Sequence, residues 1–272
     1  MKIYISADME GISGIATGDE TNPADREYPR ARALMLGEVN AAIEGALKAG
    51  AREIVVNDSH WNMRGLMLED LHPAATLISG APKPRYMMTG IDASFAAVFF
   101  IGYHARAGSA NAVIDHSYAD PSVVQSIWLN GMEVGESGVN AALAGYYGVP
   151  VALFTGDQTG CAQARDLLGA DLEFAVVKEA LGRHTANSLH PTRAHELIRA
   201  AAARALTTKR APFVLRAPIT LRLALTRSLQ AERCALLPGV TRVSGTVVEY
   251  AHDDYATLFD AFQVLLVLAE SA

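Results

Sequence analysis

The sequence predicts an α/β protein in which a mostly parallel, three-layer sheet domain (residues 1–190) precedes a smaller α+β domain (residues 191–272). Three observations support this fold class. Short apolar runs alternate with amphipathic stretches in the N-terminal half, as they do in β-α-β units. After about residue 180, apolar and polar residues alternate in the way that is typical of antiparallel strands. Hydrophobic residues make up 50% of the chain and charged residues 19%, which suffices for a sizeable core and excludes disorder.

The first half of the chain is expected to begin with a strand at residues 2–7. The apolar residues of segment 32–48 recur near helical spacing, and Gly50 follows where such a helix should end. Two further apolar runs, at residues 53–57 and 96–103, predict buried strands. These segments form the β-α-β pattern from which the parallel sheet is predicted.

A hairpin is expected next. Residues 123–129 and 132–134 flank Asn130-Gly131, a dipeptide that favours a two-residue β-turn. The elements expected beyond it are helix 136–147, strand 149–154, helix 157–168, an alanine-rich helix at 194–206, strands within 212–225 and 240–250, and a closing helix at 253–269.

Composition argues against several classes of function. The 23 basic and 29 acidic residues give a net charge of −6, whereas a general nucleic-acid binder needs a basic face. The longest apolar run, residues 264–269, is far shorter than the roughly 20 residues of a membrane span. Two acids interrupt the apolar N-terminus, which is atypical of a signal peptide. The two cysteines, Cys161 and Cys234, are expected to be buried thiols. We therefore expect a cytoplasmic protein that binds neither nucleic acid nor membranes.

Carboxylate and imidazole side chains follow three of the predicted strands. Asp8 and Glu10 follow the first strand, His60 the second and His104 the third. Because ligand sites of open α/β sheets lie beyond the carboxyl ends of the strands, these side chains are expected to meet at one rim. They form a mixed oxygen and nitrogen ligand set that suits zinc or another borderline divalent ion, and a carboxylate can bridge two metal ions roughly 3.5–4 Å apart.

Two further residues are candidates for the same crevice. His116 lies a short loop after His104, and Glu136 opens the helix after the hairpin. Each residue alone has an ordinary explanation, since an Asp-x-Glu pair is usually a solvated turn or a helix cap and a histidine after a strand usually satisfies a hydrogen bond. Their joint occurrence favours a metal site. The sequence has no dinucleotide-binding glycine motif, phosphate loop, H-E-x-x-H motif or nucleophile elbow, which argues against nucleotide binding and serine hydrolysis.

Four linked motifs occur in order along the chain. They are Ser6-Ala7-Asp8-Met9-Glu10-Gly11, Val56-Asn57-Asp58-Ser59-His60, Gly102-Tyr103-His104-Ala105-Arg106 and Val134-Gly135-Glu136. The first resembles the S-x-D-x-E-G opening of the DppA-type D-aminopeptidases, a family of dizinc metallopeptidases, and the others are similar to further motifs of that family. The resemblance implies metal ligands at Asp8, Glu10, His60, His104 and Glu136, with Asp8 bridging both ions, and a catalytic histidine at His116. Glu133 is expected to be a solvated strand residue rather than a ligand.

From this resemblance we expect a zinc-dependent aminopeptidase with two Zn²⁺ per subunit. It would hydrolyse short peptides or amides with N-terminal D-amino acids such as D-alanine, by a metal-activated water assisted by His116, either as a proton shuttle or as the nucleophile. The resemblance also implies a ring-shaped homo-oligomer, a decamer. Two alternatives stay open: a metal-dependent hydrolase of another amide or ester bond, and a non-catalytic peptide-binding module.

Overall fold

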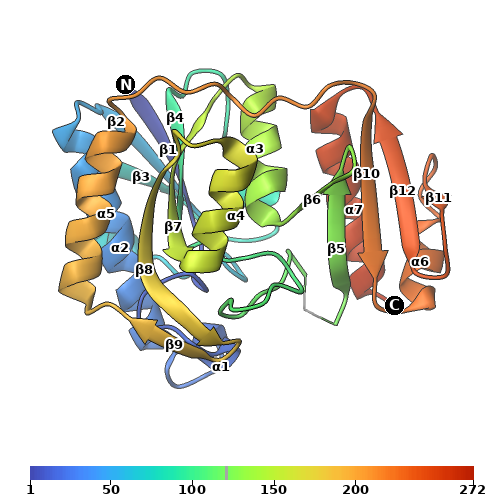
Figure 1. Ribbon diagram of the computed structural model, residues 1–272, viewed down its shortest axis with the longest axis horizontal. Helices are drawn as coiled ribbons and strands as arrows, with labels where there is room; N and C mark the ends of the chain where they lie inside the picture. The colour runs from blue at the N-terminus through green and yellow to red at the C-terminus, as the bar shows by residue number, and fades with distance from the viewer. Residues whose placement is uncertain (120–121) are drawn as a thin grey trace.

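The computed structural model describes residues 1–119 and 122–272 and contains two β-sheets that share an apolar core (Figure 1). The larger sheet has seven strands in the order β3-β2-β1-β4-β7-β8-β9, and every pairing is parallel except that of β8 with β9. Its strands are β1 (Lys2–Ala7), β2 (Glu53–Asp58), β3 (Ala75–Ile78), β4 (Ala97–Ile101), β7 (Val151–Asp157), β8 (Glu173–Gly182) and β9 (Thr185–Ser188). The predicted mostly parallel sheet is thereby confirmed.

Helices cover both faces of the larger sheet and give the three layers expected from the sequence (Figure 1). One layer contains α2 (Tyr28–Lys48) and α5 (Pro191–Ala205), and the other contains α3 (Glu136–Tyr146) and α4 (Gln158–Leu168). Alternate side chains of β1 point to opposite faces of the larger sheet. Ile5 lies in the apolar cluster with α2 and α5, and Tyr4 lies in the cluster with α3 and α4. Helices α2 and α5 approach closely at Gly45, where a Cβ atom would collide with the carbonyl oxygen of Arg199.

The smaller sheet is antiparallel throughout, with the order β11-β12-β10-β5-β6. Its strands are β5 (Val124–Leu129), β6 (Met132–Val134), β10 (Ile219–Leu225), β11 (Thr241–Arg242) and β12 (Val247–His252). The predicted hairpin is confirmed, because Asn130 and Gly131 have positive φ angles of 48° and 80° between β5 and β6. Helices α6 (Ser228–Cys234) and α7 (Tyr255–Glu270) pack against this sheet.

The two sheets are interleaved along the chain. The β5–β6 hairpin belongs to the smaller sheet although it precedes β7 and β8 of the larger one. Conversely, α5 begins at Pro191 and packs against the larger sheet, in a cluster with Ile198 at its centre. The division into residues 1–190 and 191–272 stays a prediction, and these crossings show that the sheets exchange elements across it.

Several elements differ from the sequence expectation. Only residues 219–225 of the segment 212–225 pair as a strand, because Pro212 and Pro218 lack the backbone N–H that a ladder needs. A turn at Ser244-Gly245 divides the segment 240–250 into β11 and β12. Strands β3, β8 and β9 lie outside the elements that the sequence predicts. In β8 the buried Lys178 interrupts the apolar pattern that would indicate a strand. The remaining short elements are α1 (Gly18–Thr21), η1 (Leu68–Asp70) and η2 (Tyr86–Met88).

Two expectations from composition concern burial. Cys161 and Cys234 are free thiols and both are buried, as expected. Among the helices of the described residues, none combines the length and the apolar character needed to cross a bilayer.

Candidate metal centre

The site begins where three neighbouring strands of the larger sheet end. β1 lies between β2 and β4, and strand order reverses there, which is the switch point at which α/β sheets place their ligand sites. The strand ends are level, because Ala7 pairs with both Asp58 and Ile101. The N–H of Asp8 still donates to Ile101 O (2.8 Å). The ladder therefore fixes the backbone at the first acidic residue.

Glycines allow the strand-end loops to lie directly on one another. The N–H of Gly11 donates to Gly102 O (2.8 Å), and a Cβ atom at Gly11 would overlap Tyr103 O. Gly102 has a φ of +70°, which side-chain-bearing residues adopt only with strain. This contact brings ligand atoms of Glu10 and His104 within 4.8 Å of each other.

The two strand-end histidines point their Nε2 atoms at carboxylates. His104 Nδ1 lies 2.9 Å from Ala105 O, and since a carbonyl oxygen only accepts, Nδ1 carries the proton. His104 Nε2 then faces Asp8 Oδ2 and Glu136 Oε1, each at 3.4 Å. His60 Nε2 lies 3.2 Å from Glu10 Oε1. Five of the sequence candidates are thus in contact, in one group around each imidazole ring.

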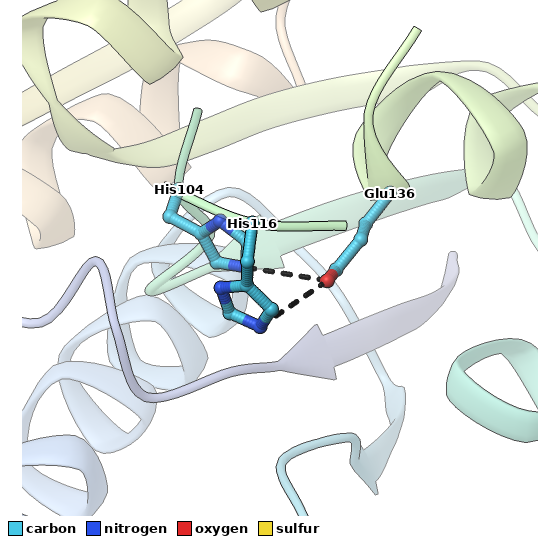
Figure 2. Close-up of side chains that lie close together, drawn as sticks. All are labelled: His104, His116 and Glu136. Atoms are coloured by element: carbon cyan, nitrogen blue, oxygen red, sulfur yellow. Dashed lines mark ion pairs between the residues drawn. The ribbon is translucent and has the colours of Figure 1, made fainter. Parts of the chain in front are cut away.

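Glu136 and His116 complete the cluster from the side of the smaller sheet. Glu136 is the first residue of α3, directly after β6 and Gly135. Figure 2 shows the His104 and His116 rings lying against each other beside Glu136; their centroids are 4.2 Å apart with 8° between the planes. His116 Nε2 is 3.7 Å from Glu136 Oε1, and its Nδ1 faces Ile114 O at 2.9 Å. The His116 side chain is 17% exposed, whereas His104 is 2% exposed.

A cavity of about 500 Å³ opens above the cluster, within the range of small-molecule sites. Asp8, Glu10, His60, His116 and Glu136 line its floor, and its walls include Trp61, Tyr86, Tyr118 and Arg183. The wall residues follow no strand pattern, and sequence reasoning missed them. Tyr118 links wall and floor, because its N–H donates to Glu136 Oε1 (2.6 Å).

Opposed charges shift the pKa values of these buried groups in different directions. Burial raises the pKa of Asp8 well above its usual range, and the neighbouring Glu10 and Glu136 raise it further. Burial also raises the pKa of Glu10, but the facing His60 outweighs this effect and leaves it well below the usual range. Burial lowers the pKa of His104, yet Glu136 and Asp8 raise it to about 10 overall. Three carboxylates in one buried volume therefore require positive charge close by.

The donor atoms fit a metal ion. Among the described residues, Asp8 Oδ2, His104 Nε2 and both ring nitrogens of His60 are buried without a hydrogen-bond partner, which is costly unless another ligand satisfies them. Two overlapping groups have ligand atoms within 4.8 Å: Asp8, Glu10 and His104, and His104, His116 and Glu136. Oxygen and imidazole donors of this kind suit zinc. His104 is common to both groups, and the bridging role expected of Asp8 stays a prediction.

All six site residues predicted from the sequence lie in this one cluster. Glu133 lies outside it, because its carboxylate pairs with Arg106 Nε at 3.3 Å on a half-exposed part of β6. Sequence reasoning missed the hydrogen bonds beneath the cluster. There Ser6 Oγ lies 2.7 Å from both Ser59 Oγ and Tyr103 OH. This network ties together the ends of β1, β2 and β4.

Three comparisons relate this chain to known proteins. A family model described as D-aminopeptidase matches residues 1–264. A D-aminopeptidase of Bacillus subtilis (strain 168) is 38% identical over 275 residues, which cover 100% of this chain and 98% of that relative. A solved structure, the zinc-dependent D-aminopeptidase DppA from Bacillus subtilis, described as a self-compartmentalizing protease, aligns with a TM-score of 0.96. It shares 37% sequence identity, and the alignment covers 100% of this chain and 99% of that one.

Proposed function

The chain belongs to the D-aminopeptidase family, and on that premise we propose that it is a zinc-dependent aminopeptidase with two zinc ions per subunit. Asp8, Glu10, His60, His104 and Glu136 would hold the ions, and the bridging role expected of Asp8 is part of this proposal. The substrates are short peptides or amides with an N-terminal D-amino acid such as D-alanine. The preference for D-residues rests on the relatives, which are D-aminopeptidases.

The observation that carries this proposal is the set of buried ligand atoms on Asp8, His60 and His104 that make no hydrogen bond, although carboxylates and imidazoles face one another at 3.2 and 3.4 Å. A buried polar network that lacks partners destabilises the fold by the full desolvation cost of each group. Bound cations remove that cost and balance the carboxylates at the same time. A peptide-binding module without metal has no use for such an arrangement.

The chain's own residues supply positioning and proton transfer. Zinc at this site supplies polarisation of the scissile carbonyl and activation of water. His116 faces the cavity and is held through Nδ1 by Ile114 O, so its Nε2 is available for a proton. We assign it the transfer of a proton from the attacking water to the leaving amine nitrogen. Trp61, Tyr86 and Tyr118 form the walls that restrict the cavity to short substrates.

We also propose that the protein is a cytoplasmic homo-oligomer, a ring of ten subunits. The structural relative is described as self-compartmentalizing. Val264 and Val267 of α7 and Leu236 after α6 are 43%, 65% and 77% exposed, and we assign these apolar side chains to contacts between subunits. Light scattering on the purified protein measures the mass of the assembly.

Metal removal and substrate choice test the activity. Chelation is expected to abolish peptidase activity and zinc return to restore it, with two zinc ions per chain by elemental analysis. D-aminoacyl amides are expected to be hydrolysed faster than their L-forms and than phosphoesters. Activity that survives complete chelation contradicts the metal mechanism, and faster phosphoester turnover indicates a different hydrolase.

A further inference from the structure

Two of the five lysines in the chain lie inside the protein, next to the metal cluster. Lys178 is 1% exposed and Lys83 is 8% exposed. Lysine is almost never fully buried unless its ammonium group is paired, because the desolvation of the charge is costly. Neutral oxygen atoms satisfy both ammonium groups here. All three acceptors of Lys178 lie in the loop that carries Glu10, and two of the three acceptors of Lys83 lie at the end of β2, just before His60.

Lys178 extends from the middle of β8 into the loop that follows β1. Its Nζ donates to the carbonyl oxygens of Glu10, Ile12 (3.0 Å) and Ile15 (2.7 Å). An ammonium group has three N–H donors, and this loop accepts all three. The loop from Glu10 to Ile15 is therefore folded around one charge, and the backbone of a predicted ligand is one of its anchors.

Lys83 makes the corresponding arrangement at the end of β2. Its Nζ donates to Asn57 Oδ1 (2.7 Å), Asp58 O (2.6 Å) and Ile78 O (3.1 Å). These contacts fasten the ends of β2 and β3 together two residues before His60. The chain then turns at His60, whose carbonyl oxygen accepts from Met63 N (2.7 Å).

We propose that Lys178 and Lys83 are positioning residues that hold Glu10 and His60, respectively, in the geometry required for metal binding. This inference rests on the proposed function. Its physical basis is that three hydrogen bonds from one charged donor fix the backbone more strongly than three neutral ones do. The same hydrogen bonds direct the two ammonium groups toward the backbone of the segments that carry Glu10 and His60.

The two halves of the cluster, Glu10 with His60 and His104 with Glu136, are supported differently. The segments of Glu10 and His60 each contact a buried ammonium group. The other three lysines of the chain lie elsewhere: Lys2 bonds to Ser94 (2.9 Å), for example, and Lys48 is exposed on α2. His104 and Glu136 are held instead by backbone contacts with Ala105 and Tyr118. Loss of a buried lysine is therefore expected to affect the Glu10–His60 half selectively.

The test compares Lys178→Met and Lys83→Met with two controls. Methionine keeps the length and apolar stem of lysine and removes the ammonium group. Lys48→Met removes an exposed lysine. Leu223→Ala truncates a fully buried side chain of β10 in the smaller sheet, away from the cluster. Zinc content by elemental analysis, zinc affinity by chelator competition and the absorption spectrum of the cobalt(II)-substituted protein are measured on each folded variant.

Both lysine variants are expected to bind one of the two ions about 10- to 100-fold more weakly and to lose part of the cobalt spectrum, as substitutions around metal ligands do. Both controls are expected to match the wild type, Leu223→Ala even at a lower melting temperature. If Lys178→Met fails to fold, Lys83→Met decides the question, since Lys83 lies nearer the surface.

Folded lysine variants with wild-type affinity for both ions overturn the inference, as does a uniform loss of both ions that Leu223→Ala reproduces. A wild type without zinc overturns the proposed function as well, whereas unchanged variants of a dizinc wild type overturn the inference alone.

Discussion

The larger and the smaller sheet border the same cluster and support it in different ways. Parallel strands β1, β2 and β4 end level with one another, so three short segments deliver Asp8, Glu10, His60 and His104. The smaller sheet delivers one predicted ligand, Glu136, through the hairpin that leads into α3. It also backs the cavity wall, because Tyr118 packs edge-on against Phe262 of α7 at 4.9 Å. The parallel sheet concentrates polar chemistry at one edge, while the antiparallel sheet closes the site over it.

The largest effect is expected at the edge of the larger sheet. Asp8→Asn exchanges the carboxyl group that lies 3.4 Å from His104 for an amide, a weaker metal ligand, and is expected to lower kcat/KM by more than about 10⁴-fold with loss of zinc. Carbonyl polarisation and water activation, each worth several kcal/mol, both depend on bound metal. Glu133→Gln, three residues before Glu136 and paired with Arg106, is the control and should keep full activity. Full zinc content and activity in Asp8→Asn would show that the level strand ends do not form the site.

His116 separates chemistry from metal binding within the cluster. His116→Gln is expected to lower kcat by about 10²- to 10⁴-fold, the usual contribution of a general acid–base group, while both zinc ions stay bound. The reason is its partly exposed position beside the cavity, in contrast to the fully buried His104. Single-turnover kinetics and elemental analysis measure the two properties separately. If zinc and activity disappear together, His116 belongs with the ligands.

The smaller sheet can be weakened without loss of the ligands from the larger one. Leu223→Ala in β10 is expected to lower the free energy of unfolding by about 2–5 kcal/mol, because Leu223 is fully buried and the change leaves a cavity. The folded variant should still bind two zinc ions. Urea unfolding at fixed zinc concentration provides the measurement. Selective loss of one ion from the folded variant would mean that Glu136 depends on the whole smaller sheet.

The smallest effect is expected in the helix layer beneath the cluster. Glu38 of α2 is 2% exposed and accepts from Ser13 N (2.8 Å); burial raises its pKa from the usual 4.5 to about 7, against the opposing effects of Ser13 N and Lys178. The pKa of Glu38 is higher in the folded than in the unfolded protein. Its contribution to the free energy of unfolding is therefore fully present below pH 4.5 and is lost as the pH rises to about 7.

Glu38→Gln keeps the acceptor for Ser13 N and removes this titration. The variant is expected to gain up to about 3 kcal/mol over the wild type above pH 7, and nothing near pH 4.5. Unfolding midpoints of both proteins between pH 4 and pH 8 measure the difference. A constant difference across this range would show that Glu38 is already ionised in the folded protein.

The same contrast between the sheets explains what the sequence could predict. Asp8, Glu10, His60 and His104 directly follow apolar runs, and a parallel sheet brings such positions together whatever its exact strand order. Glu136 follows a hairpin marked by Asn130-Gly131, and His116 follows His104 by a short loop. Local signals therefore sufficed to expect the four strand-end residues at one edge of the sheet, whereas the roles of Glu136 and His116 came from the family resemblance.

The supporting contacts could not be predicted in this way. Lys178 donates to carbonyl oxygens more than 160 residues away, and a carbonyl oxygen is common to every residue type. Its charge also hides the apolar character of β8. The pairing of β5 with β10 is also distant in sequence, so the sequence around Ile127 holds no information about its partner Leu223.

The central place of β10 in the smaller sheet has a consequence for synthesis on the ribosome. β10 lies between β5 and β12, so the hairpin that leads to Glu136 lacks its inner neighbour until residue 225 has emerged. By then the strands that carry Asp8, His60 and His104 are already complete. Because long-range antiparallel pairing forms slowly, we expect Asp8, His60 and His104 to reach their final positions in the nascent chain before Glu136 does. Zinc loading would then mark the end of folding, and a subunit that holds its full complement of metal would be one whose two sheets have already joined.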